Sequence, residues 1–171
     1  MPTERERRFL TLVRENDFRL RRICRVYERD PEARKDLYQE ILLQLWRSFP
    51  SFAGESSPDT WLYRVALNTA LMQARRRSRR PESLLEAEVG AEEGVAPDRV
   101  DGALEDTERH ERLYAAIDHL GDVEKMLITM SLDERSYREI AAVVGISENH
   151  VGVKLHRIRK ALGAWLTEEK V

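Results

Sequence analysis

The residue pattern with the clearest chemical meaning lies near the carboxyl end of the chain. Ser136-Tyr137-Arg138-Glu139 has the form of a capping box, in which a serine hydroxyl and a glutamate carboxylate each accept a backbone N–H at the start of a helix. Gly145 then stands where a helix favours a left-handed end, and Ser147 can cap a second helix. Two capped helices joined by a glycine turn predict a helix-turn-helix, whose second helix enters the major groove of duplex DNA. A tight helical hairpin with no nucleic-acid role is the alternative.

The second helix of this motif should turn apolar residues inward and polar residues outward. Four apolar residues recur at helical spacing and should form one buried stripe: Val151, Leu155, Ile158 and Leu162. The outward set begins with an acid and an amide and continues with cations: Glu148, Asn149, His150, Gly152, Lys154, His156, Arg157, Arg159 and Lys160. Side chains near the start can address base edges, and the cations can contact phosphates. The two histidines lie six residues apart and point to different faces, so no metal site is expected.

A second group of residues, in the amino-terminal half, suits single-stranded nucleic acid. A predicted loop at residues 51–56 is followed by a helix that ends in arginines, an arrangement in which bases can stack or insert while cations track the backbone. The aromatic and cationic candidates are Phe52, Trp61, Tyr63, Arg64, Arg75, Arg76 and Arg77. The alternatives are a core position for Trp61 and an arginine run that is simply solvated.

Helices must position both groups, because apolar residues recur every three or four positions and no strand-like alternation persists for five residues. The pattern predicts a helix over roughly residues 5–29 with a buried Cys24, a second from Asp30-Pro31 to Pro50, and a third that begins at Ser57-Pro58. Weak periodicity at residues 81–102 predicts a flexible linker. We therefore expect an all-α fold of two small helical bundles joined by a flexible acidic linker, the C-terminal one containing the helix-turn-helix.

Charge is unevenly distributed along the 171 residues. Residues 1–81 hold 18 Lys+Arg against 11 Asp+Glu, residues 82–111 hold 2 against 11, and residues 112–171 hold 9 against 9, so the net charges are +7, −9 and 0. A basic block beside an acidic connector suggests a polyanionic partner. The single cysteine excludes an internal disulfide and favours a reducing, cytoplasmic setting. The short apolar runs predict neither a leader peptide nor direct insertion in a membrane.

Both halves together resemble a known family. The second conserved region of bacterial RNA polymerase sigma factors is similar to residues 36–70, DLYQEILLQLWRSFPSFAGESSPDTWLYRVALNTA. Their fourth region is similar to residues 136–162, SYREIAAVVGISENHVGVKLHRIRKAL. Because only a short connector separates the two, the chain resembles the compact extracytoplasmic-function (ECF) group. The resemblance implies a region 2 domain at 1–81, an acidic linker at 82–111 that runs into the first helix of the next domain, and a region 4 domain at 112–171.

The resemblance also implies which residues bind which partner. Those that would dock on the clamp coiled coil of the largest subunit of core polymerase are Asp36, Gln39, Glu40 and Leu43. Those that would capture a base flipped out of the minus-ten promoter element, and hold its phosphates, are Phe52, Ala53, Gly54, Glu55, Ser56, Val65, Asn68, Arg75 and Arg76. Those that would read the minus-thirty-five element as duplex are Ser136, Tyr137, Glu148, Asn149, His150, Gly152, Lys154 and Arg157.

A sigma factor is the function that this resemblance implies: a non-enzymatic subunit that directs RNA polymerase core enzyme to promoters and assists their opening. Its expected partners are core enzyme, promoter DNA and an anti-sigma factor, with no cofactor, metal or small-molecule substrate. A stand-alone helix-turn-helix regulator would need duplex DNA only, and would leave the amino-terminal polar face and loop without a function. A small helical enzyme would need a convergent acid, base or metal set, and the sequence shows none.

Overall fold

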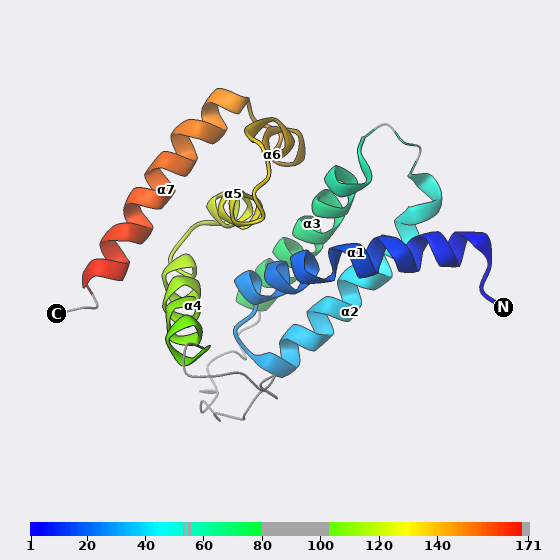
Figure 1. The fold of residues 1–171 in the computed structure, drawn as a ribbon, viewed down its shortest axis with the longest axis horizontal. Coiled ribbons are helices and arrows are strands. Elements are labelled where there is room, and N and C mark those ends of the chain that lie inside the picture. Colours follow the sequence, from blue (N-terminus) through cyan, green and yellow to red (C-terminus); the bar gives the residue numbers. More distant parts are fainter. Residues whose placement is uncertain (53, 55, 80–102, 169–171) are drawn as a thin grey trace.

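The computed structural model describes residues 1–52, 54, 56–79 and 103–168, and within these ranges every regular element is a helix (Figure 1). In chain order they are α1 (Glu4–Tyr27), α2 (Pro31–Ser48), the 3-10 turn η1 (Phe49–Ser51), α3 (Pro58–Ser78), α4 (Ala103–Ile117), α5 (Asp122–Leu132), α6 (Tyr137–Val144) and α7 (Glu148–Glu168). Helices α1–α3 gather on one side of the molecule and α4–α7 on the other, which confirms the predicted all-α fold of two bundles. The flexible linker predicted at residues 81–102 lies outside the described residues.

Side-chain caps explain where the helices of the first bundle begin. Asp30 caps α2 by accepting the Ala33 N–H at 2.7 Å, and Ser57 caps α3 by accepting the Thr60 N–H at 3.1 Å. A proline follows each cap, at the position where its missing N–H costs no intrahelical hydrogen bond. Both helices therefore start where the sequence predicts.

The core of the first bundle is formed where α1, α2 and α3 face one another. Its buried apolar residues are Leu20, Ile23, Leu37, Ile41, Leu45, Leu62, Ala66, Leu67 and Ala70. Cys24 lies on the same stripe of α1 and is 2% exposed, and burial raises the pKa of its thiol to about 12. The thiol therefore stays protonated and packs as a small apolar group, as predicted.

The second bundle is built around α5. Five consecutive residues, from Met126 to Met130, are buried, because this helix is covered by α6 and α7 and also by α1 of the first bundle. A helix surrounded on several sides is apolar around most of its circumference. Gly145 ends α6 with φ +81°, the left-handed conformation that glycine adopts without strain, and so turns the chain into α7.

The two bundles contact each other directly. Helix α3 packs against α6, while α1 packs against α4 and α5. Asp133 follows α5 and is buried at the contact, where it accepts a hydrogen bond from Tyr63 Oη at 2.6 Å and forms an ion pair with Arg22. Nearby, Arg64 donates to the Ala142 carbonyl oxygen at 2.7 Å. Because buried polar groups need hydrogen-bond partners, this cluster fixes how the two bundles meet.

Candidate polymerase and nucleic-acid interfaces

One face of α2 carries the residues predicted to contact core polymerase. Asp36 and Gln39 are exposed, and Glu40 is half-buried. Leu43, on the same helix, is 39% exposed. Gln44 donates to Glu40 Oε1 at 2.7 Å and so restrains that carboxylate. Acids and an amide surrounding an exposed leucine form a surface with both an apolar contact and a polar rim, as protein interfaces require.

The loop after η1 presents an aromatic ring at the end of the first bundle. Phe52 is half-buried, and its ring centroid lies 5.1 Å from that of Trp61, which is itself half-buried. Gly54 is exposed with φ +75°, a conformation that turns the chain and suits glycine. Ala53 and Glu55, also predicted to contact minus-ten DNA, lie outside the described residues. The accessible part of Phe52 offers a base a surface on which to stack.

Helix α3 continues this surface with an outward amide. Trp61, Val65 and Asn68 are four and three residues apart, so they lie along one face of the helix. Asn68 is exposed, Val65 is half-buried, and so is Ser56 at the end of the loop. An amide beside an apolar and aromatic surface can bind a base edge while the ring stacks on it. Val65 and Asn68 therefore continue the face that begins at Trp61 beside Phe52, whereas Arg75 and Arg76 of the predicted minus-ten set lie in the last turn of α3.

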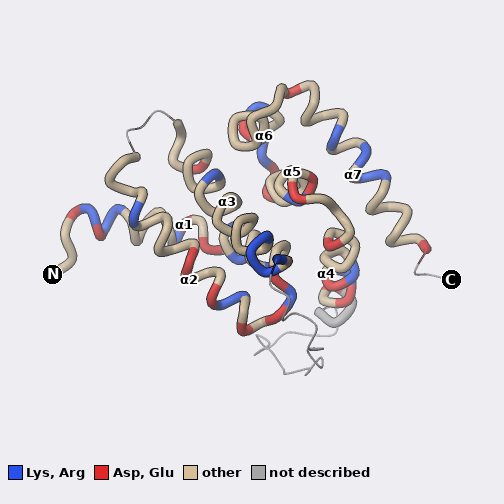
Figure 2. The backbone as a smooth tube through the Cα atoms, turned by 180° about the vertical axis from the view of Figure 1, so that it is seen from behind, with Lys and Arg blue, Asp and Glu red and all other residues tan. Residues whose placement is uncertain are grey.

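Basic residues gather in the last turn of α3 (Figure 2), and the structure pairs two of them with acids. Arg75 Nε lies 3.2 Å from Asp122 Oδ2 in the second bundle, and Arg77 pairs with the buried Glu28. Arg76 is exposed and forms no ion pair with any acid in the described ranges. A DNA phosphate would therefore meet Arg76 directly, whereas at Arg75 it would compete with Asp122 for the guanidinium.

Tyr63 is not a stacking platform, and its prediction as one is wrong. Its side chain is fully buried, and its hydroxyl donates to Asp133. Burial and this hydrogen bond raise the pKa of Tyr63 far above its ordinary value. The spacing gives the reason: Tyr63 is two residues from Trp61 and so points away from the loop, toward the second bundle.

The helix-turn-helix has the caps that the sequence predicts. Ser136 Oγ accepts the Glu139 N–H at 3.2 Å, and Glu139 Oε2 accepts the Ser136 N–H at 2.7 Å. That backbone hydrogen bond is the main reason why the pKa of Glu139 lies below its ordinary value. Ser147 Oγ accepts the His150 N–H at 3.2 Å and starts α7. These hydrogen bonds fix α6 and α7 at the angle set by the glycine turn.

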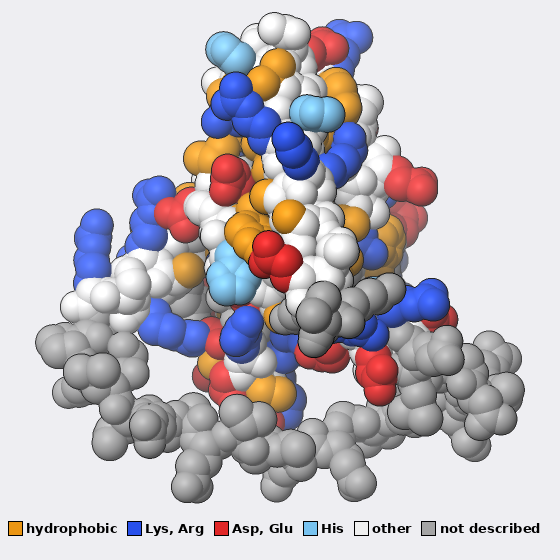
Figure 3. All heavy atoms as spheres, turned by 90° about the vertical axis from the view of Figure 1, so that its left-hand side faces the viewer, with side chains coloured by type: hydrophobic (Ala, Val, Ile, Leu, Met, Phe, Trp, Pro, Cys, Tyr) orange, Lys and Arg blue, Asp and Glu red, His pale blue; other side chains and the backbone are white. Residues whose placement is uncertain are grey.

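Helix α7 presents a polar and cationic face to solvent. Its buried residues are those predicted: Val151, Leu155, Ile158 and Leu162. Its exposed residues include Glu148, Asn149, His150, Lys154, His156, Arg157, Arg159 and Lys160, while Gly152 is half-buried. Seen from the α7 side, Lys and Arg side chains gather on this face with histidines among them (Figure 3). The surface has the charge and the exposure that a DNA-reading helix needs.

Two apolar features interrupt this polar face. Val153 is an apolar residue with 43% of its surface exposed, beside the polar residues. The ring of Tyr137, from the start of α6, packs closely against α7 at Gly152, since a Cβ there would lie 3.2 Å from Tyr137 Cε2. The valine next to a glycine inside a polar stretch was the available signal in the sequence. The contact between Tyr137 and Gly152 joins residues of two different helices, so no pattern of neighbouring residues predicts which side chain makes it.

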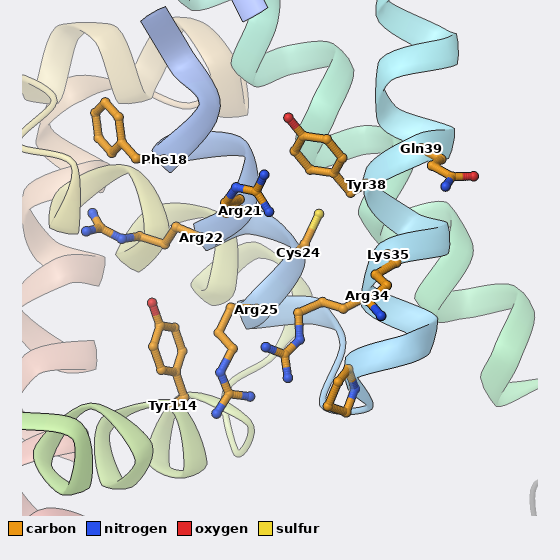
Figure 4. Close-up of a pocket in the computed structure, with 11 residues that line it drawn as sticks. Phe18, Arg21, Arg22, Cys24, Arg25, Arg34, Lys35, Tyr38, Gln39 and Tyr114 are labelled. Atoms are coloured by element: carbon orange, nitrogen blue, oxygen red, sulfur yellow. The ribbon is translucent and has the colours of Figure 1, made fainter. Parts of the chain in front are cut away.

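A basic groove of about 740 Å³ runs between α1, α2 and α4 (Figure 4). Its cations are already engaged: Arg21 pairs with Asp17 at 2.7 Å, and Arg25 pairs with Glu111 at 2.5 Å. The Arg21 hydrogen bond lowers the pKa of Asp17, and burial together with a 2.5 Å hydrogen bond to Asp17 raises the pKa of Tyr38 to about 12. Acids therefore balance Arg21 and Arg25, whereas Arg34 donates to the carbonyl oxygens of Glu28 and Arg29, and burial lowers its pKa.

The described residues also allow two limited statements about other sites. They include no group of three or more His, Cys, Asp and Glu side chains placed to hold a metal ion. They also include no helix with the length and apolar character needed to cross a membrane.

The family models and known proteins that the sequence matches are those of sigma factors. Residues 12–80 match the family model of sigma-70 region 2, and residues 110–162 match that of sigma-70 region 4. The ECF RNA polymerase sigma-E factor of Escherichia coli strain K12 is 33% identical over 135 residues, which cover 74% of this chain and 70% of that protein. The RNA polymerase sigma-H factor of Pseudomonas aeruginosa is 31% identical over 144 residues, which cover 78% of this chain and 72% of that protein.

Solved structures share the fold. CnrH, solved in complex with the cytosolic domain of CnrY, superposes with a TM-score of 0.66 at 21% identity, covering 95% of this chain and 89% of that one. The sigma factor RpoE from Bartonella quintana, solved in complex with the anti-sigma factor NepR, has a TM-score of 0.68 at 20% identity and covers 94% and 95% of the two chains. The likeness extends over both bundles.

Proposed function

Because this chain belongs to the ECF group of sigma-70 RNA polymerase sigma factors, we propose how its two bundles share the recognition of a promoter. The protein directs RNA polymerase core enzyme to promoters. The first bundle binds core enzyme through the face of α2 around Glu40 and Leu43, and captures an unstacked base of the minus-ten element beside Phe52 and Asn68. The second bundle places α7 in the major groove of the minus-thirty-five element.

The observation that carries this division is the presence of two unlike nucleic-acid surfaces on separate bundles. Asn68 is exposed on a face that also holds a partly accessible aromatic pair, a chemistry suited to an unpaired base. Helix α7 instead exposes polar and cationic residues along a convex helix, which fits a groove of duplex DNA. A stand-alone duplex reader would use only the second surface, and the region 2 match of the first bundle disfavours it.

We assign the roles to domains with the predicted boundaries, namely region 2 at 1–81, the connector at 82–111 and region 4 at 112–171. The protein acts without enzymatic chemistry of its own, in the cytoplasm, where its polymerase partner works. An anti-sigma factor is a further expected partner, because RpoE, which shares this fold, was solved bound to the anti-sigma factor NepR.

The contact between the bundles has a consequence for this function. Arg64 and Arg75, on the DNA-binding helix α3, are held by Ala142 and Asp122 of the second bundle. In this closed arrangement they are occupied by protein partners rather than phosphates. A phosphate that takes the place of either protein partner must break that contact, so part of the binding free energy is spent there.

Run-off transcription tests the proposal. Core polymerase that lacks its own sigma factor is mixed with this chain, and promoter fragments retained by the complex are selected from genomic DNA. We expect co-elution of the chain with core enzyme and transcripts that start at fixed positions on the selected fragments. Co-elution without any added transcription at these fragments would contradict the proposed function, and so would failure to bind core enzyme.

A further inference from the structure

An apolar patch interrupts the polar face of the helix-turn-helix. Tyr137 is 42% exposed and Val153 is 43% exposed. With Gly152 they form the apolar part of a concavity of about 430 Å³ on the solvent side of α7. Its polar rim consists of Glu148, Asn149, His156 and Arg157. The patch is therefore an apolar floor within a charged surface, where water is poorly bound and a small apolar group would fit.

Gly152 gives this concavity its shape. A Cβ at this position would lie 3.2 Å from Tyr137 Cε2 and 3.7 Å from Tyr137 Cδ2, so the ring rests against the backbone of α7. No left-handed backbone conformation requires a glycine here, since positive φ among the described glycines is confined to Gly54 and Gly145. Gly163 of the same helix has open space around it, because a Cβ added there would have no atom within 4 Å. Gly152 therefore differs from it by providing a seat for an aromatic ring.

The residues around the patch indicate what it contacts. Lys154, Arg157 and Lys160 are exposed on the same helix and supply positive charge for phosphates. When such cations hold a recognition helix in the major groove, the residues near its amino end face the base edges, and Val153 lies in the second turn of α7. Thymine alone presents a methyl group there, and apolar side chains are its usual contacts.

We propose that Tyr137 and Val153 read the 5-methyl group of a thymine in the minus-thirty-five duplex. The methyl group enters the concavity and contacts the Tyr137 ring and the Val153 side chain. Gly152 is a positioning residue, because it lets the ring lie against α7. This inference rests on the proposed function, since it requires α7 in the major groove. It specifies an A·T pair at a defined place in the recognised sequence.

The test replaces thymine by deoxyuridine, which removes the methyl group and leaves base pairing and the protein unchanged. The minus-thirty-five sequence is first selected from a random duplex library with holoenzyme that contains the full chain. Each thymine of the selected element is then replaced singly. We expect binding to weaken about fourfold at one or two positions, the effect of losing one buried methyl group, and to stay unchanged elsewhere.

Protein variants connect that effect to the patch. Tyr137→Ala and Val153→Ala should reduce the preference for thymine over deoxyuridine, and the double variant should bind both duplexes equally. Tyr137→Phe keeps the ring and should keep the preference. Gly152→Ala displaces the ring and should reduce it, whereas Gly163→Ala, the matched control on the same helix, should leave it intact.

The outcomes separate this inference from the proposed function. If every deoxyuridine duplex binds like the thymine duplex while a scrambled duplex is rejected, methyl reading is wrong and recognition of the minus-thirty-five element stands. A selected element without an A·T pair overturns the inference in the same way. A thymine preference that persists in the double variant overturns the assignment to Tyr137 and Val153. Equal binding of the selected and scrambled duplexes contradicts the proposed function itself.

Discussion

The hydrogen bond from Tyr63 Oη to Asp133 Oδ2, 2.6 Å long and buried, joins two helical bundles through residues that are 70 positions apart in the sequence. The second carboxylate oxygen of Asp133 pairs with Arg22 of α1, so one side chain of the region 4 bundle holds two helices of the region 2 bundle. A buried carboxylate is stable only when such partners compensate for its lost hydration. Asp133 therefore acts as the main polar connection of the closed arrangement.

Asp133→Ala should open this arrangement. The change leaves the Tyr63 hydroxyl without its acceptor and Arg22 without its counter-ion, so we expect a loss of about 2–4 kcal/mol in the free energy of unfolding. Separation of the bundles should also increase the radius of gyration in small-angle scattering. Glu111→Gln is the control, because Glu111 is 63% exposed in its pair with Arg25 and should contribute less than about 1 kcal/mol. An Asp133→Ala protein with wild-type stability and dimensions would contradict this role.

Charge reversal on α2 should disrupt binding to core polymerase. The double variant Asp36→Lys and Glu40→Lys changes two acids of the predicted docking face, and we expect at least roughly tenfold weaker binding because charge complementarity is reversed. Glu15→Lys is the matched control, since Glu15 is an exposed acid of α1 outside that face. Fluorescence titration of labelled protein with core enzyme measures both. Equal losses in the double variant and the control would indicate a general charge effect instead of a docking face.

The two glycines of α7 should respond differently to alanine. Gly163→Ala removes a residue with poor helix propensity from an open position, so the free energy of unfolding should rise by about 0.5–1 kcal/mol. Gly152→Ala should gain less, because the new Cβ meets the Tyr137 ring at 3.2 Å. Urea unfolding measures each difference. When Tyr137→Ala removes the ring, the change Gly152→Ala should raise the free energy of unfolding by as much as Gly163→Ala does. A smaller rise would show that the ring is not the cause.

Acid should weaken the capping box of α6. The Ser136 N–H bond to Glu139 lowers the pKa of that carboxyl from its ordinary 4.5. A pKa that is lower in the folded than in the unfolded state adds stability that is complete above the unfolded value and disappears as the pH falls through the folded value. The difference in stability between wild type and Glu139→Gln should therefore be constant above about pH 5 and shrink below pH 4.5. Ser136→Ala, which removes the other half of the box, should cost about 1 kcal/mol at neutral pH. A Glu139→Gln difference that does not vary with pH would contradict the assignment.

Local patterns were sufficient for the helices but not for the contact between bundles. The proline after Asp30, the Ser136 capping box and the Gly145 turn are encoded by neighbouring residues, and each is found where predicted. Tyr63 is the exception, because helical periodicity shows that a residue is on a face but not which partner covers that face. Its partner, Asp133, is a charged residue just beyond a helix, and no spacing rule places it in a buried interface.

For the candidate site too, local patterns predict which face of a helix is exposed but not which residues of other helices it contacts. The outward set of α7 could be read from its helical period, since the buried residues alternate with it at spacings of three and four. The contact of the Tyr137 ring with Gly152 depends on how α6 lies across α7, which only the folded structure shows. The partial engagement of Arg75 by Asp122 likewise depends on the packing of the two bundles.

Promoter opening by the Asn68→Ala variant tests the central claim most directly, namely that the first bundle captures an unpaired base while the second reads duplex. Permanganate reactivity of thymines in the minus-ten region measures opening, and binding of holoenzyme to a minus-thirty-five duplex measures the other function. Thr11→Ala, an exposed change on α1, serves as the control. We predict that Asn68→Ala lowers permanganate reactivity about tenfold or more, from the loss of a hydrogen bond to the flipped base, and leaves duplex binding unchanged. Equal loss of both activities, or full opening in the variant, would contradict the account.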